Sequence, residues 1–250
     1  MFPRKKNVLL LVSLLKAYGV RQVILSPGSR NAPLIHSFML DDFFHCQMVV
    51  DERNAAFMAL GMMQATQEPV AICCTSGTAL LNYAPAVAEA YYQQLPLIVL
   101  SADRSPEWIN QMDGQTIPQP GVFGAMAIQH INLPEVVDAS SDWYCQRLCH
   151  EALLAATSKV KGPVHINIPL SEPLFDYSVQ ELPVLNKITH SFPVKHVPID
   201  KYAQVWRNSA KRLLVIGQLL PSSDTFLEKL KLFAEKRNCV ILAEHLSNIQ

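Results

Sequence analysis

Polar residues that can bind anions or exchange protons follow four apolar, strand-like runs of this sequence. The segments are VILSPGSRNAPL (23–34), VVDERNAAFMALG (49–61), AICCTSGTALLNYAP (71–85) and IVLSADRSPE (98–107). Each reads as a strand followed by a tight turn and then a helix or loop. In an open α/β sheet, ligands bind in the crevice at the carboxyl ends of the strands. Four such ends, three of them with a charged residue, therefore predict one converging site.

The first segment has the residues of an anion site. Ser29 or Asn31 can cap the helix that follows, and Pro33 is tolerated in its first turn. Backbone N–H groups at a helix N-terminus attract anions, and the planar guanidinium of Arg30 suits a carboxylate. On these residues alone, a βα turn with a solvated arginine is an equal alternative.

The second and third segments carry an acid and a small-residue turn. Glu52 can complement a helix dipole, which is the common role of such an acid, or it can exchange a proton with a ligand nitrogen in a cleft. Gly77 and Thr78 start a helix that Pro85 should break near 82–83. No GK[ST] and no GxGxxG follows, so neither a P-loop nor a dinucleotide site is expected.

The fourth segment leads into a long loop rich in proline and glycine. Ordered loops at the carboxyl edge of a sheet are often functional. Arg104 and Gln115 offer donors to a carboxylate or a hydroxyl group. A surface arginine and an ordinary loop glutamine are the alternative.

The elements that must position these residues alternate between strand and helix. Strands are expected at 21–26, 46–50, 69–74, 96–100, 128–133 and 163–168, and helices near 31–40, 52–66, 77–92 and 140–158 after an amphipathic first helix. Runs such as PVAICC and PLIVLS are almost continuously apolar, as in a parallel sheet covered by helices on both faces. We predict a doubly wound α/β fold with a mostly parallel six-stranded sheet.

Three parts of the chain follow from these patterns. Residues 1–178 form the first domain, the proline-rich stretch 179–198 is a linker, and residues 199–250 begin a second α/β domain. A helix, a strand at 212–217, a helix at 222–236 and a strand at 239–244 are too little for a stable sheet domain. We therefore expect a fragment of a longer polypeptide.

Composition narrows the class of partner. Lys+Arg and Asp+Glu both number 21, so no net field attracts nucleic acid or an anionic membrane. The six cysteines have no zinc spacing and are expected to be free, buried thiols in a reducing compartment. No apolar run reaches the ~20 residues of a membrane span. A cytoplasmic protein without a metal site of its own is predicted.

Taken together and in order, these motifs resemble one family. PGSR, DER, TSGTA, ADR-x-PE, the loop glutamine and QPG with a following aromatic residue are similar to the amino-terminal half of the 2-succinyl-5-enolpyruvyl-6-hydroxy-3-cyclohexene-1-carboxylate synthases. These are thiamine-diphosphate-dependent enzymes of menaquinone biosynthesis. The resemblance covers about residues 4–178 and continues more loosely through HINIPLSEPLF (165–175).

The resemblance implies a domain order and an assembly. A pyrimidine-binding domain comes first, a central domain second and a diphosphate-binding domain last, and the active site lies between two subunits of a homodimer or dimer of dimers. The motif that holds Mg²⁺ and the diphosphate begins Gly-Asp-Gly, and this sequence contains no Gly-Asp pair. The diphosphate-binding domain is therefore expected to be absent from this chain, which alone should be inactive.

The resemblance also implies roles for individual residues. Glu52 matches the glutamate that hydrogen-bonds the cofactor's aminopyrimidine ring, and Gly77 and Thr78 match positions beside the cofactor. The positions that hold substrate carboxylate and hydroxyl groups are Ser29, Arg30, Arg104 and Gln115. The implied reaction decarboxylates 2-oxoglutarate and adds the remaining four-carbon unit to isochorismate.

Two departures and two alternatives remain. Asn31-Ala32 stands where relatives often have Ser-Thr, and Asp113-Gly114 replaces a common Ala-Asn. Both pairs lie in loops and can tune substrate contacts. An acetolactate-synthase-like enzyme is one alternative, although pyruvate brings a single carboxylate for these arginines. A non-catalytic module that binds a carboxylated metabolite is the other.

Overall fold

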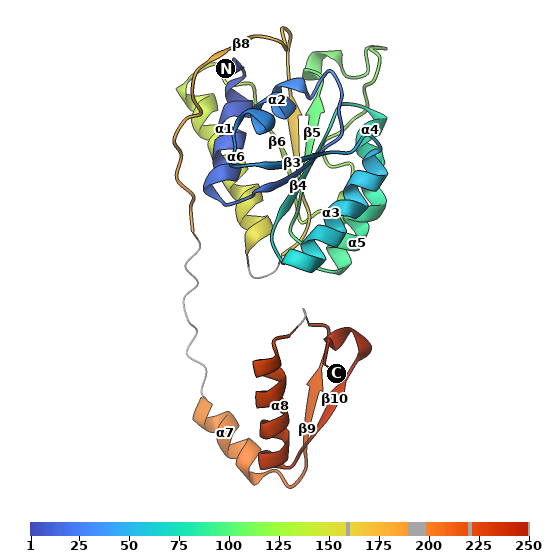
Figure 1. Cartoon of the computed structure of the whole chain (residues 1–250), viewed down its shortest axis with the longest axis vertical. Helices are drawn as coiled ribbons and strands as arrows, with labels where there is room; N and C mark the ends of the chain where they lie inside the picture. The colour runs from blue at the N-terminus through green and yellow to red at the C-terminus, as the bar shows by residue number, and fades with distance from the viewer. Residues whose placement is uncertain (159–160, 190–198, 220–221, 250) are drawn as a thin grey trace. The chain divides into compact units, whose positions relative to one another are not determined.

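The computed structural model describes residues 1–158, 161–189, 199–219 and 222–249 (Figure 1). The chain divides into two compact units, Met1–Ser191 and Phe192–Gln250. The candidate residues named above all lie in the first unit.

A six-stranded parallel sheet forms the centre of the first unit. Its strand order is β3-β2-β4-β5-β7-β6. The strands are β2 (Gln22–Leu25), β3 (His45–Met48), β4 (Val70–Cys74), β5 (Leu97–Asp103), β6 (Gln129–Asn132) and β7 (Val164–Pro169). Every pair within this sheet is parallel. The predicted doubly wound α/β fold is confirmed, and the carboxyl ends of the strands share one edge.

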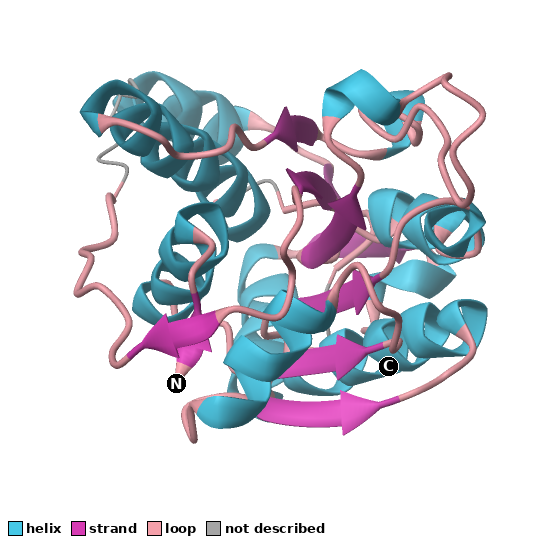
Figure 2. Ribbon diagram, turned by 90° about the horizontal axis from the view of Figure 1, so that it is seen from above, coloured by secondary structure: helices cyan, strands magenta, loops and turns pink. Residues whose placement is uncertain are grey.

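Helices cover both faces of this sheet (Figures 1 and 2). One face carries α1 (Lys6–Ala17), α2 (Ala32–Leu40) and α6 (Ala139–Thr157), and the other carries α3 (Glu52–Thr66) and α5 (Ala84–Tyr92). Cys73 belongs to the first apolar core and its neighbour Cys74 to the second. The alternation of side chains along β4 thus places the two thiols on opposite faces, as predicted.

The first helix is more deeply buried than its amphipathic pattern suggests. Residues 7–15 are all buried, including Asn7 and Ser13. The cause is a contact between distant parts of the chain, because β1 (Phe2–Pro3) pairs antiparallel with β8 (Tyr177–Val179). Helix α1 packs against β1, α2 and α6. This small sheet was not predicted.

The helix after the TSGT turn is broken where Pro85 predicts. Helix α4 (Thr78–Leu81) ends before a turn at Asn82 and Tyr83, and α5 then begins at Ala84. Two short 3-10 helices, η1 (Pro106–Trp108) and η2 (Gly124–Met126), lie in and just after the long loop that follows β5.

The second unit contains the predicted alternation of helix and strand. Helix α7 (Ile199–Asn208) is followed by β9 (Arg212–Ile216), α8 (Asp224–Arg237), β10 (Cys239–Ala243) and the 3-10 helix η3 (His245–Ser247). Strands β9 and β10 are parallel. Part of the predicted linker, 190–198, lies outside the described residues.

Two further observations concern the described part of the chain. The six cysteines are free, but the expectation that all are buried is wrong for Cys46 and Cys239, which are half-buried. No helix there combines the length and apolar character that crossing a bilayer requires.

Candidate functional site

Direct contacts join the turns that follow β2, β3 and β4. The Ser26 hydroxyl donates to the Val49 carbonyl at 2.9 Å, and the Ser26 N–H donates to the Cys73 carbonyl at 2.8 Å. Gly28 packs so tightly on Thr75 that a Cβ at residue 28 would lie 2.4 Å from the Thr75 Cβ. The PGSR, DER and TSGT segments therefore converge, and glycine is required at position 28 because there is no room for a side chain.

The long loop after β5 contacts the same edge of the sheet at Gly77, in the turn after β4. This glycine has a φ of +84°, and a Cβ there would lie 2.9 Å from the Gln115 carbonyl oxygen. Its N–H donates to the Gln119 Oε1 at 2.7 Å. Both the backbone conformation and the close approach favour glycine at this turn.

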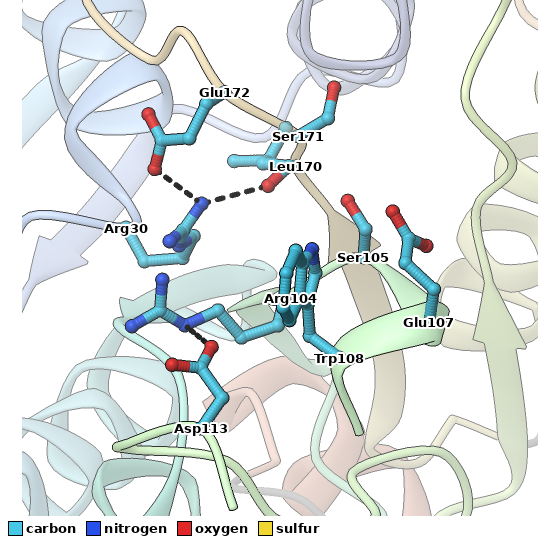
Figure 3. Close-up of a pocket in the computed structure, with 9 residues that line it drawn as sticks. All are labelled: Arg30, Arg104, Ser105, Glu107, Trp108, Asp113, Leu170, Ser171 and Glu172. Carbon is cyan, nitrogen blue, oxygen red and sulfur yellow. Dashed lines mark hydrogen bonds and ion pairs between the residues drawn. The ribbon is translucent and has the colours of Figure 1, made fainter. Parts of the chain in front are cut away.

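Arg30 and Arg104 line one pocket of about 470 Å³ (Figure 3). The other residues that line it are Ser105, Glu107, Trp108, Asp113, Leu170, Ser171 and Glu172. Arg30 comes from the turn after β2 and Arg104 from the end of β5. The structure thus brings together the two arginines that the sequence singled out.

Each arginine is already held by a carboxylate of the same chain. Arg30 is 6% exposed, and its Nη1 donates to the Leu170 carbonyl at 2.9 Å and lies 3.1 Å from the Glu172 Oε1. Arg104 pairs with Asp113, with 3.3 Å between Nε and Oδ2, and its Nη2 donates to the Gly114 carbonyl at 3.3 Å. Paired guanidinium groups in a pocket of this size suit a ligand with more than one carboxylate.

Glu52 occupies the first residue of α3, outside the lining of the arginine pocket. Asp51 caps this helix, because its Oδ1 accepts from the Asn54 N–H at 2.8 Å. Glu52 is half-buried, and its nearby carboxylate adds to the effect of burial in raising the pKa of the Tyr83 phenol. The acid therefore lies at the carboxyl edge of the sheet, at the start of α3.

The other predicted site residues are more peripheral. Ser29, Thr78 and Gln115 are exposed, and none of them lines the arginine pocket. The predicted side-chain cap of α2 is wrong. Asn31 stands at the N-cap position, but its Nδ2 donates to the Ser26 carbonyl at 2.9 Å, and Ser29 makes no side-chain cap.

A buried polar network, missed from the sequence, lies below the same edge. Asn167 Oδ1 accepts from Ser101 at 2.8 Å and from Gln119 at 2.7 Å. Its Nδ2 donates at 2.8 Å to both Asp103 and Asn132. These four bonds use the whole hydrogen-bonding capacity of the Asn167 amide. The alternation of polar and apolar residues in HINIP was the available signal.

His165 extends this network. Its Nε2 lies 2.7 Å from the Ser101 Oγ, and its Nδ1 has no hydrogen-bond partner. Burial lowers the pKa of His165 to about 3, so the ring is neutral at ordinary pH. Burial also raises the pKa of Asp103, an effect that the hydrogen bond from Asn167 opposes.

The residues at this edge fit one end of a thiamine cofactor. The buried hydroxyl oxygen of Thr75 has no hydrogen-bond partner, and the half-buried Glu52 begins the helix after β3. An aminopyrimidine offers the donors and acceptors that such groups require. Among the described residues, no group of three His, Cys, Asp or Glu side chains could hold a metal ion.

Known proteins are similar to this chain over nearly all of its residues. The profile described as "Thiamine pyrophosphate enzyme, N-terminal TPP binding domain" matches residues 8–127. The 2-succinyl-5-enolpyruvyl-6-hydroxy-3-cyclohexene-1-carboxylate synthase of Bacteroides thetaiotaomicron is 46% identical over 99% of this chain and 45% of its own length. The synthase of Flavobacterium johnsoniae is 42% identical over 96% of this chain and 43% of its own.

Solved structures with low sequence identity show the same fold. The Rhodococcus jostii RHA1 thiamine diphosphate-dependent 4-hydroxybenzoylformate decarboxylase has a TM-score of 0.75 at 18% identity, over 95% of this chain and 44% of that one. The benzoylformate decarboxylase of Polynucleobacter necessarius has a TM-score of 0.72 at 19% identity, over 99% and 44%.

The chain spans less than half the length of the curated relatives it matches. Their identity to it nevertheless extends over nearly all of its residues. The chain belongs to the 2-succinyl-5-enolpyruvyl-6-hydroxy-3-cyclohexene-1-carboxylate synthase family of thiamine-diphosphate enzymes, of which it matches the amino-terminal part.

Proposed function

We propose that this chain binds the aminopyrimidine end of thiamine diphosphate and the carboxylates of the substrates in a decarboxylating, carbon–carbon bond-forming transferase. The donor substrate would be 2-oxoglutarate and the acceptor isochorismate. The names of the relatives support this reaction. The observation that carries the proposal is the shared pocket of Arg30 and Arg104.

Glu52 would act on the cofactor rather than on the substrate. When bound, thiamine diphosphate supplies a nucleophilic carbon that takes up the keto acid and stabilises the negative charge left when carbon dioxide departs. The Glu52 carboxyl group would hydrogen-bond a pyrimidine ring nitrogen and exchange a proton with it. Its place outside the arginine pocket fits this division of tasks.

Arg30 and Arg104 would hold substrate carboxylates. A hydrogen bond to a charged group contributes about 1.5–3 kcal/mol, so loss of one arginine should weaken substrate binding roughly ten- to a hundredfold. Ser29 and Gln115 are exposed at the same edge and would contribute polar contacts to the substrate. Gly77 and Thr78, in the adjacent turn, would lie beside the cofactor.

The rest of the site would come from residues outside this chain. Mg²⁺ and the cofactor diphosphate need ligands that the described residues do not group together. We propose that these ligands lie in a diphosphate-binding domain, that the active site forms between the subunits of a cytoplasmic homodimer or tetramer, and that the isolated 250-residue chain is inactive.

A choice of donor substrate tests the proposal. The full-length gene product is assayed for carbon dioxide release with thiamine diphosphate and Mg²⁺, from 2-oxoglutarate and from pyruvate. Release from 2-oxoglutarate that isochorismate stimulates is the expected result. Preference for pyruvate would instead indicate an acetolactate-synthase-like reaction, and cofactor or carboxylate binding without any turnover would indicate a non-catalytic module.

A further inference from the structure

We propose that Gln119 is a positioning residue that fixes the cofactor-side turn at Gly77 and the substrate-side loop after β5 in one arrangement. This residue lies in the QPG sequence of the loop that follows β5. The positioning itself rests on the contacts of this chain. Its effect on cofactor and substrate rests on the function proposed above.

The Gln119 side chain is fully buried and makes three hydrogen bonds. Its Oε1 accepts from the Gly77 N–H at 2.7 Å, and its Nε2 donates to the Ala102 carbonyl at 3.2 Å and to the Asn167 Oδ1 at 2.7 Å. The partners fix the orientation of the amide, because a backbone N–H can only donate and a carbonyl can only accept. Both amide hydrogens are used.

The bond to Gly77 satisfies the N–H of the residue that precedes α4. Gly77 stands at the N-cap of α4, where no side-chain cap forms, and the residue is buried. A buried N–H without a partner is unfavourable. Gln119 satisfies this N–H from a position 42 residues away in the chain. The turn expected to face the cofactor is therefore held by a loop residue.

The other bonds connect Gln119 to the backbone of Arg104. Asn167 accepts from Gln119 and donates to the Asp103 Oδ2 at 2.8 Å. The Asp103 Oδ1 accepts from the Arg104 N–H at 2.8 Å. A continuous series of hydrogen bonds, buried except for the part-buried last one, thus runs from the Gly77 turn to the backbone of Arg104.

A close contact makes the two loops interdependent. The position of a Cβ at Gly77 would lie 2.9 Å from the Gln115 carbonyl oxygen. A side chain at residue 77 would therefore clash with the loop, and a shift of the loop away from the turn would break the bond from Gly77 to Gln119. Close packing and the Gln119 bond together hold the loop against the turn.

The test uses the full-length protein and a matched pair of variants. Gln119→Met keeps an unbranched side chain of similar length and removes all three hydrogen bonds. Ser101→Ala is the control, because it removes a hydrogen bond to the same Asn167 atom and the bond to His165 but touches neither Gly77 nor the loop. Hydrogen exchange of the Gly77 amide and the half-saturating thiamine diphosphate concentration are measured for each.

In Gln119→Met we expect Gly77 exchange to accelerate about tenfold, as for loss of one hydrogen bond. The half-saturating cofactor concentration should rise by a similar factor at an unchanged folded fraction, and Ser101→Ala should change neither. Equal effects of the two variants, or a lower Tm with unchanged exchange and cofactor saturation, would show that Gln119 only adds stability and would overturn the proposal.

A second variant separates the two functions of the side chain. Gln119→Glu keeps an acceptor for Gly77 but loses the donors to Ala102 and Asn167. Gly77 exchange should stay near the wild-type rate while exchange across residues 104–118 increases. Equal acceleration in both segments would contradict the assignment. Amide hydrogen exchange is measured without substrate. The exchange result therefore tests the positioning by Gln119 even if the proposed reaction is wrong.

Discussion

The Arg104 guanidinium lies 3.3 Å from the Asp113 carboxylate, inside the pocket that Arg104 shares with Arg30 (Figure 3). Asp113 comes from the loop after β5. A substrate carboxylate that reaches Arg104 must therefore compete with a carboxylate of the protein. The affinity of the pocket for a carboxylate therefore depends on Asp113 at Arg104, as it depends on Glu172 at Arg30.

Removing that internal carboxylate should strengthen substrate binding. In Asp113→Asn we expect the KM for isochorismate to fall up to about fivefold, because partly exposed ion pairs contribute only about 0–1 kcal/mol. Steady-state kinetics of the full-length protein measure the change. Glu107→Gln is the matched control, since Glu107 lines the same pocket without an ion pair to either arginine among the described contacts. A higher KM in Asp113→Asn would contradict this account.

Loss of Arg30 should impair substrate binding more than folding. Arg30→Lys keeps the charge but not the planar pair of donors that a carboxylate prefers. We expect the KM of a carboxylate substrate to rise about ten- to a hundredfold, the range for one charge-assisted hydrogen bond. Glu172→Gln removes only the exposed partner of Arg30, and its KM should fall or stay unchanged. Equal KM values for wild type and Arg30→Lys would exclude this role.

His165 should make stability fall in acid. Burial lowers its pKa to about 3 in the folded protein, against 6.5 as the ordinary value, so protonation favours the unfolded chain below pH 6.5. The stability that the neutral His165 ring contributes is fully present above pH 6.5, and it is lost as the pH falls toward about 3. Between pH 6.5 and pH 5 one such group costs about 2 kcal/mol.

Urea unfolding at pH 7 and pH 5 measures this dependence. His165→Gln should remove most of the difference between the two pH values, and His45→Gln, a change of an exposed histidine in β3, should leave it as in the wild type. The same pH dependence in wild type and His165→Gln would assign the effect to other groups.

Two glycines should respond in opposite ways to the same substitution. Gly28→Ala places a methyl group 2.4 Å from the Thr75 Cβ, and we expect a loss of about 1–3 kcal/mol in the free energy of unfolding. Gly61→Ala lies within α3 with no atom within 4 Å of the new Cβ, and it should gain about 0.5–1 kcal/mol from helix propensity. Chemical denaturation of both variants decides, and a stabilised Gly28→Ala would contradict the packing described.

Local patterns predicted the sheet and the site edge for a physical reason. β4 is buried along its whole length, so its apolar run VAICC directly reflects two covered faces. The carboxyl ends of parallel strands meet at one edge of the sheet, so the sequence alone predicts that Arg30 and Arg104 lie close together.

Other features depend on contacts that no local pattern encodes. The pairing of β1 with β8 joins residues about 175 positions apart and buries α1 beyond its amphipathic face. Gln119 and Asn167 meet across 48 residues, and a glutamine in a proline-rich loop reads as a surface residue. The Asn31 amide turned inward because Ser26 offers a buried carbonyl, which helix-capping preferences do not register.

Isochorismate-dependent carbon dioxide release from 2-oxoglutarate tests the central claim most directly. The full-length protein is compared with its Glu52→Gln variant, with thiamine diphosphate and Mg²⁺ present and with folding verified by circular dichroism. The account predicts release in the wild type that rises with isochorismate and collapses in the variant, because the amide cannot exchange a proton with the pyrimidine ring. Release that is unaffected by Glu52→Gln, or no release from the wild type, would contradict it.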